Sequence, residues 1–167
     1  GCLWNLAMNK ISVVFVCLGN ICRSPTAHGV FERMVAAQGL GDRIRVDSAG
    51  TGDWHLGHAP DSRSVEVAQR RGIDLSALRS RLVSAKDFHD GAYVLAMDGQ
   101  NLSNLEILRP TDFAGHLGLF LDYSANFEER EVPDPYYSGA QGFDLVIDLI
   151  EDASAGLLKH LKKHHRL

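Results

Sequence analysis

The sequence predicts an α/β fold, in which an open parallel sheet carries helices on both of its faces. Two features of the chain indicate this. Short apolar runs alternate with segments of helical periodicity, and three of those runs are almost uninterrupted, as is typical of strands buried on both faces. A strand, a helix and a second strand in succession imply parallel pairing through right-handed crossovers, which place helices against the two faces of the sheet.

Four segments have the composition of strands, and they span residues 11–16, 45–47, 92–97 and 117–121. In open parallel sheets the ligand binds beyond the carboxyl ends of the strands. The residues that directly follow the four predicted strands are Cys17, Ser48, Asp98 and Asp122. Position alone therefore favours a site that contains Cys17, whereas we expect Asp98 and Asp122 to make structural hydrogen bonds.

Three further segments have helical periodicity. The first begins at Ser24 and places its apolar residues on one face. The second covers residues 62–71 and ends at Gly72, which suits a left-handed cap. The third, at 143–161, is the strongest because its apolar residues recur at i, i+3, i+4 and i+7. The basic residues at its end complement the helix dipole and do not mark a nucleic-acid site.

Length and composition bound the class of protein. The 167 residues suffice for one domain with a core, and 45% apolar with 23% charged residues is ordinary for a globular protein. The formal charge of −4 argues against bulk nucleic-acid binding, and no apolar run approaches the roughly 20 residues that span a bilayer. We expect residues 1–9 to be a tag remnant or disordered lead-in, too short for a secretory signal, and residues 10–167 to form a single domain.

The cysteines and histidines suggest neither a disulfide framework nor a metal site. The three cysteines, Cys2, Cys17 and Cys22, are too few and too unevenly placed for a disulfide framework. This favours a reducing compartment, and we expect a cytoplasmic protein. Four histidines lack the spacing of metal ligands, so neither a metal nor another cofactor is expected; they are His55, His58, His89 and His116.

Residues 17–23, called the 17–23 loop below, have the composition of an anion site. Gly19 and Asn20 tolerate a positive φ, so the loop can turn its N–H groups inward as a nest. Ser24 is a good N-cap and Pro25 is a preferred first helical residue. No acid lies in the first turn of the helix that follows, which leaves its positive end free for a phosphate.

A thiol and a guanidinium complete this loop. A free thiol has a pKa of about 8.5, and a helix N-terminus with a nearby cation lowers that value. We therefore expect a thiolate at position 17 at neutral pH. Arginine suits position 23 better than lysine because its planar fork binds two phosphoryl oxygens at once. The combination indicates nucleophilic attack on a tetrahedral dianion.

Together with distant motifs, the loop resembles the low-molecular-weight protein-tyrosine phosphatases. The matching motifs are Cys-Leu-Gly-Asn-Ile-Cys-Arg-Ser-Pro at 17–25, Val-Asp-Ser-Ala-Gly-Thr at 46–51, Asp-Ser-Arg at 61–63, Gly-Ile-Asp-Leu-Ser at 72–76, Ala-Met-Asp at 96–98 and Asp-Pro-Tyr-Tyr at 134–137. The similarity covers roughly residues 10–160. It implies a three-layer open sheet of four parallel strands with the phosphate-binding loop after the first strand, and metal-independent hydrolysis of phosphotyrosine in two steps through a phosphocysteine.

The resemblance also implies a role for each matching residue. Cys17 would be the nucleophile, Arg23 the phosphate clamp and Asp134 the general acid and base. Ser24 would stabilise the thiolate. The other residues expected to bind phosphate or to support the loop are Leu18, Gly19, Asn20, Ile21, Cys22 and Ser48. The expected walls of the substrate crevice are Trp54, Tyr136 and Tyr137.

Chemistry indicates Asp134 independently of the resemblance. A phenolate leaves more easily when an acid protonates its oxygen, an effect of about 10²–10⁴-fold. Neither a thiolate nor a guanidinium supplies that proton. The prolines on both sides of Asp134 stiffen its segment, and the two tyrosines that follow partly desolvate it.

Two further expectations come from comparing the chain with the family pattern. Cys22 would form a reversible disulfide with Cys17, which a thiol reductant reopens and which protects the nucleophile from over-oxidation. The family often has a histidine after the Gly-Ile-x-Leu-Ser motif, whereas residues 77–81 here read Ala-Leu-Arg-Ser-Arg. Support for the 17–23 loop must therefore come from other groups.

Three other activities stay open at this point. Arsenate reduction on the same fold uses further cysteines downstream, and none follows Cys22. A phosphocysteine carrier or an inactive phosphopeptide binder has no need of the acid Asp134. Related protein-arginine phosphatases tend to have Thr where this chain has Ile21. Phosphotyrosine proteins are therefore the expected partners, and nucleic acid and membranes are not.

Overall fold

Four parallel strands form the centre of the molecule in the computed structural model, which describes residues 10–167. In chain order they are β1 (Ile11–Cys17), β2 (Ile44–Gly50), β3 (Tyr93–Ala96) and β4 (His116–Leu119). They pair in the spatial order β2-β1-β3-β4, all in parallel. The predicted open parallel sheet is confirmed, and the lead-in expected at residues 1–9 lies outside the described residues.

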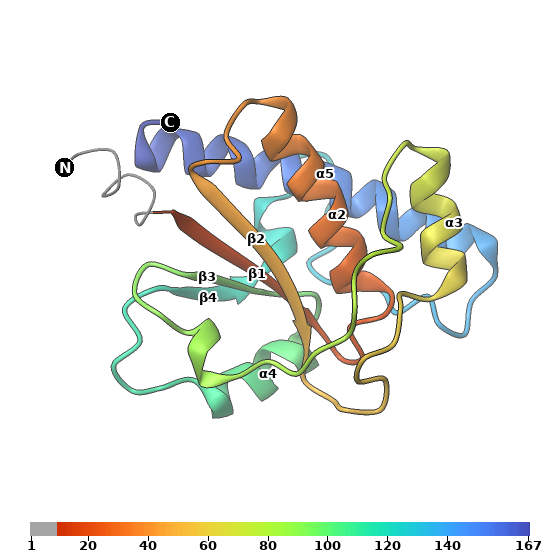
Figure 1. Ribbon diagram of the computed structural model, residues 1–167, viewed down its shortest axis with the longest axis horizontal. Helices are drawn as coiled ribbons and strands as arrows, with labels where there is room; N and C mark the ends of the chain where they lie inside the picture. The colour runs from red at the N-terminus through yellow and green to blue at the C-terminus, as the bar shows by residue number, and fades with distance from the viewer. Residues whose placement is uncertain (1–9) are drawn as a thin grey trace.

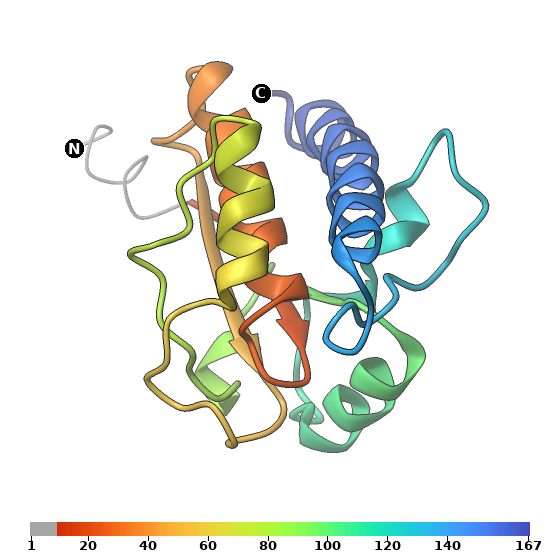
Figure 2. The same ribbon diagram turned by 90° about the vertical axis from the view of Figure 1, so that its right-hand side faces the viewer.

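Helices cover both faces of this sheet (Figure 1, Figure 2). Residues 10–167 form the helices α2 (Arg23–Ala37), α3 (Ser62–Arg70), α4 (Gly99–Leu108) and α5 (Ala140–His165), with two short 3₁₀ turns, η1 (Ala85–Asp87) and η2 (Phe120–Tyr123). The helices α2, α3 and α5 lie on one face, and α4 lies on the other. Among the described residues no helix combines the length and apolar composition needed to cross a membrane.

The central strand β1 is buried on both faces, as its apolar sequence predicts. Because successive side chains of a strand point to opposite faces, Phe15 belongs to the core under α2 and α5, whereas Val14 and Val16 belong to the core on the α4 side. The ring of Phe15 packs edge to face with Phe31 at 5.7 Å and with Phe120 at 4.8 Å. These contacts fix the strand from which the 17–23 loop departs.

Several predicted boundaries differ from those observed. Strand β2 runs from Ile44 to Gly50, beyond the predicted 45–47, because its polar residues interrupt the apolar pattern. The fourth strand ends at Leu119, and the rest of the predicted segment turns into η2. The left-handed conformation predicted at Gly72 is confirmed, with a φ of 78°.

The helix α4 is absent from the sequence-based prediction. Only Asn101 and Leu105 of its residues are buried, so no apolar stripe repeats along it. Its start is nevertheless well defined, because the Asp98 carboxylate accepts a hydrogen bond from the backbone N–H of Asn101 at 2.7 Å. The structural role expected for Asp98 is therefore confirmed, and it is an N-cap.

The last turn of α5 meets the sheet through a cluster of histidine and tyrosine side chains. The phenol of Tyr93 lies 2.9 Å from Nε2 of His165, and the rings of Tyr93 and His116 lie 5.8 Å apart. Burial, together with the charge of His160, lowers the pKa of His116. Burial also lowers the pKa of His165, with His164 and His160 adding to the effect.

These lowered pKa values make the stability of the protein depend on pH. A histidine with a lower pKa in the folded state leaves the unfolded state binding more protons once the pH falls below about 6.5. We expect the contribution of these histidines to the free energy of unfolding to be fully present above that pH. The free energy of unfolding should then decrease as the pH falls towards about 5. Urea unfolding across this range measures the slope. The double variant His116→Asn/His165→Asn should flatten it, and an unchanged slope would contradict the assignment.

Candidate active site

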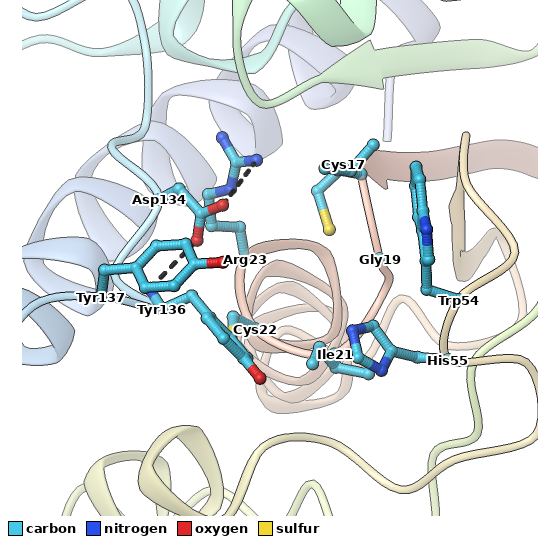
Figure 3. A pocket seen from close by; sticks show the side chains of 11 residues that line it. Cys17, Gly19, Ile21, Cys22, Arg23, Trp54, His55, Asp134, Tyr136 and Tyr137 are labelled. Carbon is cyan, nitrogen blue, oxygen red and sulfur yellow. Dashed lines mark hydrogen bonds and ion pairs between the residues drawn. The ribbon is translucent and has the colours of Figure 1, made fainter.

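A pocket of about 340 Å³ opens where β1 passes into α2, at the carboxyl end of the sheet (Figure 3). Three stretches of chain form it: the 17–23 loop, residues 54–55 after β2, and residues 134–137 before α5. The lining residues are Cys17, Leu18, Gly19, Ile21, Cys22, Arg23, Trp54, His55, Asp134, Tyr136 and Tyr137. The structure thus brings the three predicted catalytic residues and the three predicted wall residues to one pocket.

The 17–23 loop turns its backbone carbonyls outward. The carbonyl oxygens of Cys17, Leu18, Gly19 and Ile21 each accept a hydrogen bond from outside the loop, at distances between 2.7 and 3.0 Å. The donors, in the same order, are the N–H groups of Thr51 and Gly52, the hydroxyl of Ser80 and the N–H of Asp61. With the carbonyls held outside, the N–H groups of the loop are available to an anion on the inside, as in a nest.

Of the two residues expected to allow a positive φ, only Asn20 adopts one, at 55°. Its side chain is buried and fixed at both ends, donating to Ser24 Oγ at 2.8 Å and accepting from the N–H of Arg81 at 3.1 Å. Gly19 has a different function, because a Cβ there would lie 2.9 Å from the ring of His55. Glycine at this position leaves room for the His55 ring, which a larger side chain would have to displace, and does not serve a positive φ.

Ser24 is not the N-cap of the helix, contrary to the prediction. The helix α2 begins at Arg23, and the residue in the cap position, Cys22, provides no side-chain hydrogen bond. The Ser24 hydroxyl instead lies 3.0 Å from Sγ of Cys17. Because Ser24 Oγ already accepts from the amide of Asn20, its hydrogen is available for the sulfur or for the Ala49 carbonyl, 3.3 Å away.

The floor of the pocket is electropositive. No acidic residue lies in the first turn of α2, as predicted, and no side chain caps that turn. The helix dipole and the free N–H groups therefore favour an anion at this position.

Within residues 10–167 no group of three histidine, cysteine or carboxylate side chains is placed to hold a metal ion.

One edge of the Arg23 guanidinium is anchored deep in the protein. Its Nη1 donates to Asp98 Oδ2 at 2.6 Å and to the carbonyl of Val132 at 3.0 Å. Its Nη2 lies 3.9 Å from Oδ2 of Asp134. Burial alone would lower the pKa of Arg23, but the negative charges of Cys17, Asp98 and Asp134 outweigh that effect and raise it. The guanidinium is therefore a fixed positive charge beside the thiol.

Asp98 joins this arrangement from the end of β3. One of its oxygens pairs with Arg23, and the other caps α4. A carboxylate between a guanidinium and a helix N-terminus is stabilised by both. The sequence signals for Asp98 are its place directly after a predicted strand and its place in the Ala-Met-Asp motif at 96–98. Neither signal indicates the pairing with Arg23.

The segment that carries Asp134 is tied to the sheet just before it reaches the pocket. The N–H of Val132 donates to the carbonyl of Met97 at 2.8 Å, next to the end of β3. Asp134 Oδ1 accepts from the N–H of Tyr136 at 3.1 Å, which leaves Oδ2 on the side of Arg23 (Figure 3). The Asp134 side chain is 45% exposed, so it lies at the mouth of the pocket.

Aromatic side chains form two opposite walls above this floor. Trp54 and His55 lie on one side of the pocket, and Tyr136 and Tyr137 lie on the other (Figure 3). Trp54 and Tyr137 are 68% and 93% exposed, so they form the rim and not the base. His55 is a wall residue that the prediction missed, although it directly follows Trp54 in the sequence.

Cys22 and Ser48 were both predicted to support the 17–23 loop, and their side chains lie in different surroundings. Burial, with the charge of Asp61, raises the pKa of Cys22 to about 12, so its thiol stays neutral at physiological pH. The hydroxyl of Ser48 lies 3.0 Å from Nδ1 of His28 in α2. This bond connects Ser48 to the helix and not to the 17–23 loop, so support of the loop by Ser48 stays a prediction.

Comparison with known proteins agrees with this fold. The model of the family "Low molecular weight phosphotyrosine protein phosphatase" matches residues 12–167. Similar relatives include the low molecular weight protein-tyrosine-phosphatase YfkJ of Bacillus subtilis, 40% identical over 94% of this chain and 99% of the relative. A putative low molecular weight protein-tyrosine-phosphatase of Synechocystis sp. is 44% identical over 92% and 98% of the two chains.

Solved structures are similar over nearly the same length. A protein tyrosine phosphatase from Entamoeba histolytica has a TM-score of 0.85 at 36% identity, covering 93% of this chain and 99% of that one. A Drosophila arginine phosphatase has a TM-score of 0.83 at 33% identity, covering 90% and 97%. The chain belongs to the low molecular weight phosphotyrosine protein phosphatase family, which confirms the resemblance found in the sequence.

The variant Asp98→Asn separates the two roles of this carboxylate. Asparagine can still cap α4, but it removes the negative charge beside Arg23. We expect the free energy of unfolding to fall by about 1.5–3 kcal/mol, the usual contribution of a hydrogen bond to a charged group, and inorganic phosphate to bind more weakly. Asp98→Ala should cost about 1 kcal/mol more because the cap is lost as well. Urea unfolding and phosphate titration measure both effects, and a D98N variant as stable as wild type would exclude the anchoring role.

Proposed function

We propose that the protein hydrolyses phosphotyrosine in protein substrates, in two steps, through a phosphocysteine intermediate. The observation that carries this proposal is the convergence in one pocket of a thiol, a nest of N–H groups, an anchored guanidinium and a carboxylate (Figure 3). Membership of the family, with relatives named as protein-tyrosine-phosphatases, supports the same activity.

In the first step the Cys17 thiolate attacks phosphorus in line with the bond to the leaving oxygen. The S–P bond forms as the P–O ester bond breaks. The N–H groups of the 17–23 loop and the Arg23 guanidinium stabilise the charge on the three equatorial oxygens. The N–H of Asn20, 3.3 Å from the sulfur, and the hydroxyl of Ser24 stabilise the thiolate before attack and again when it leaves.

Asp134 moves the protons in both steps. In the first, it donates a proton to the phenolic oxygen as the tyrosine leaves. In the second, the resulting carboxylate removes a proton from a water molecule whose oxygen attacks phosphorus. The S–P bond then breaks, inorganic phosphate leaves and the thiolate is restored. The position of Oδ2 at the pocket mouth, beside Arg23, suits transfer to a leaving group above the phosphate.

The walls of the pocket favour an aryl phosphate. Trp54 and Tyr136 offer aromatic faces to the ring of a phosphotyrosine, and such pairs favour offset or edge-to-face contact. The short side chain of phosphoserine does not bring its phosphate to the floor past these walls. Ile21 lines the pocket and offers no hydroxyl to the guanidinium of a phosphoarginine, which argues against phosphoarginine as the substrate. Because the fold is also similar to that of a Drosophila arginine phosphatase, phosphoarginine is the alternative substrate to test.

A cytoplasmic location fits this chemistry. A catalytic thiol stays reduced in a compartment with a thiol buffer. Cys17 and Cys22 are both free and buried, and both line the pocket. A disulfide between them, reopened by a thiol reductant, would block the nucleophile reversibly and protect it from further oxidation.

Cys17→Ser should abolish turnover and keep the binding of phosphate. Serine preserves the loop but is a far weaker nucleophile than a thiolate. Release of para-nitrophenol from para-nitrophenyl phosphate measures turnover, and calorimetric titration with inorganic phosphate measures binding. Substantial turnover by C17S would rule out the phosphocysteine mechanism.

Asp134→Ala should lower kcat for a phosphotyrosine peptide by about 10²–10⁴-fold, because the leaving oxygen is no longer protonated. Phosphate release from phosphotyrosine, phosphoserine and phosphoarginine peptides provides the measurement, and we expect the wild type to prefer phosphotyrosine. Asp90→Ala is the matched control, since Asp90 is exposed and lies outside the pocket.

A wild type that prefers phosphoarginine would overturn the proposed substrate. Equal activity of D134A and the wild type on the phosphotyrosine peptide would overturn the proposed acid. Arsenate turnover that depends on thioredoxin would instead indicate a reductase.

A further inference from the structure

We propose that Ser80 is a positioning residue that holds the peptide group between Gly19 and Asn20 in the orientation that the reaction needs. The inference rests on the proposed role of Cys17 as the nucleophile. It concerns a residue outside the pocket lining, 61 residues along the chain from the peptide group on which it acts.

The two ends of this one peptide group have different partners. Its carbonyl oxygen, on Gly19, accepts a hydrogen bond from the Ser80 hydroxyl at 2.9 Å. Its N–H, on Asn20, donates to Sγ of Cys17 at 3.3 Å. Because a peptide unit is planar, with the N–H directed opposite to the C=O, fixing the carbonyl also fixes the direction of the N–H. The Ser80 hydroxyl thereby aims a hydrogen-bond donor at the sulfur without touching it.

The peptide group benefits from such a restraint because Asn20 adopts a sparsely populated backbone conformation. Its φ of 55° lies in the left-handed region, which asparagine tolerates better than most residues but which few residues other than glycine adopt. Conformations of this kind persist where the surroundings over-determine them. Two neighbouring contacts do so here: the bond from Ser80 to the preceding carbonyl, and the bond from the N–H of Arg81 to the Asn20 side chain at 3.1 Å.

Ser80 is itself held firmly enough to serve this purpose. It is 5% exposed, and its backbone is fixed on both sides, by its N–H to the carbonyl of His58 and its carbonyl to the N–H of Gly57, each at 2.9 Å. The next residue, Arg81, accepts from the N–H of Gly50 at 2.8 Å, at the end of β2. The hydroxyl is therefore carried by a segment bonded to the rest of the protein.

The charge on the next residue strengthens this attachment. The Arg81 guanidinium pairs with Asp47 of β2 at 2.9 Å and with Asp87 of η1 at 2.8 Å. Residues 80 and 81 lie in the stretch where the family often has a histidine and this chain has none. The Ser80 hydroxyl and the Arg81 N–H provide support for the 17–23 loop from that same stretch.

The test of this inference measures the reactivity of the Cys17 sulfur directly. In Ser80→Ala, the Gly19–Asn20 peptide group loses its restraint and the N–H no longer stabilises the thiolate. We expect the pH midpoint of Cys17 alkylation by iodoacetamide to rise by about 0.5–1 unit. We also expect kcat/KM for para-nitrophenyl phosphate to fall about 5–30-fold and inorganic phosphate to inhibit more weakly. Fragmentation of the peptide that contains both cysteines distinguishes alkylation of Cys17 from alkylation of Cys22, whose pKa is raised to about 12 and whose thiol therefore reacts slowly.

Two further variants separate positioning from packing. Ser80→Thr and Ser80→Val have nearly the same shape and differ in the hydroxyl, so S80T should restore the alkylation midpoint and S80V should not. Ser154→Ala is the matched control: Ser154 is fully buried in α5, and its hydroxyl has no hydrogen-bond partner among the described residues. It should leave the alkylation midpoint and the kinetics unchanged.

The outcomes distinguish this inference from the proposed function. Alkylation of Cys17 requires no turnover, so it reports on Ser80 even if the wild type hydrolyses a different phosphate ester. An S80V variant with the wild-type alkylation midpoint would overturn the positioning role. A lower unfolding temperature without a change in the midpoint, or failure of both S80A and S80V to fold, would assign Ser80 a structural role and overturn it as well.

Discussion

The outward direction of the carbonyls in the 17–23 loop is the constraint on which the rest of the site depends. An anion can occupy the loop only if N–H groups and not carbonyl oxygens face it. Four carbonyls are therefore each bonded to a donor outside the loop, and those donors come from residues 51, 52, 61 and 80. Segments that never touch the phosphate thus determine whether it can bind, because each peptide group is planar and its two ends cannot turn independently.

The order of the strands explains how these donors reach the loop. Strand β1 lies between β2 and β3, so both neighbouring strands end beside the loop. At the end of β2, Gly50 permits a close approach: a Cβ there would lie 2.7 Å from the carbonyl oxygen of Leu18. At the end of β3, Asp98 reaches the Arg23 guanidinium. A site at this edge therefore follows from the parallel arrangement, in which all carboxyl ends meet.

Arg23 connects the two halves of the chemistry. The same guanidinium that faces the thiol also holds the carbonyl of Val132, two residues before Asp134. Burying a charge is costly unless it is paired and hydrogen-bonded. Asp98 provides this pairing for the buried guanidinium, with its Oδ2 2.6 Å from Nη1 of Arg23. Nη1 is thus committed to structural hydrogen bonds, whereas Nη2 remains on the side of the pocket. One residue therefore both holds the segment that carries Asp134 and presents a positive charge to the pocket.

The sequence alone determined the parallel sheet and the 17–23 loop at a strand end, and it indicated Asp134 as the candidate acid that the structure places in the same pocket. Each of these leaves a local pattern: an apolar run, a turn with an acid-free helix start, and an aspartate between two prolines. It placed Ser24 wrongly as a cap and missed α4, His55 and the pairing of Asp98 with Arg23. Only the tertiary structure decided which carbonyl Ser80 would hold and what Ser24 would contact. Such hydrogen bonds join residues far apart in the chain, and their partners are set by how the strands and loops pack and not by any spacing along the sequence.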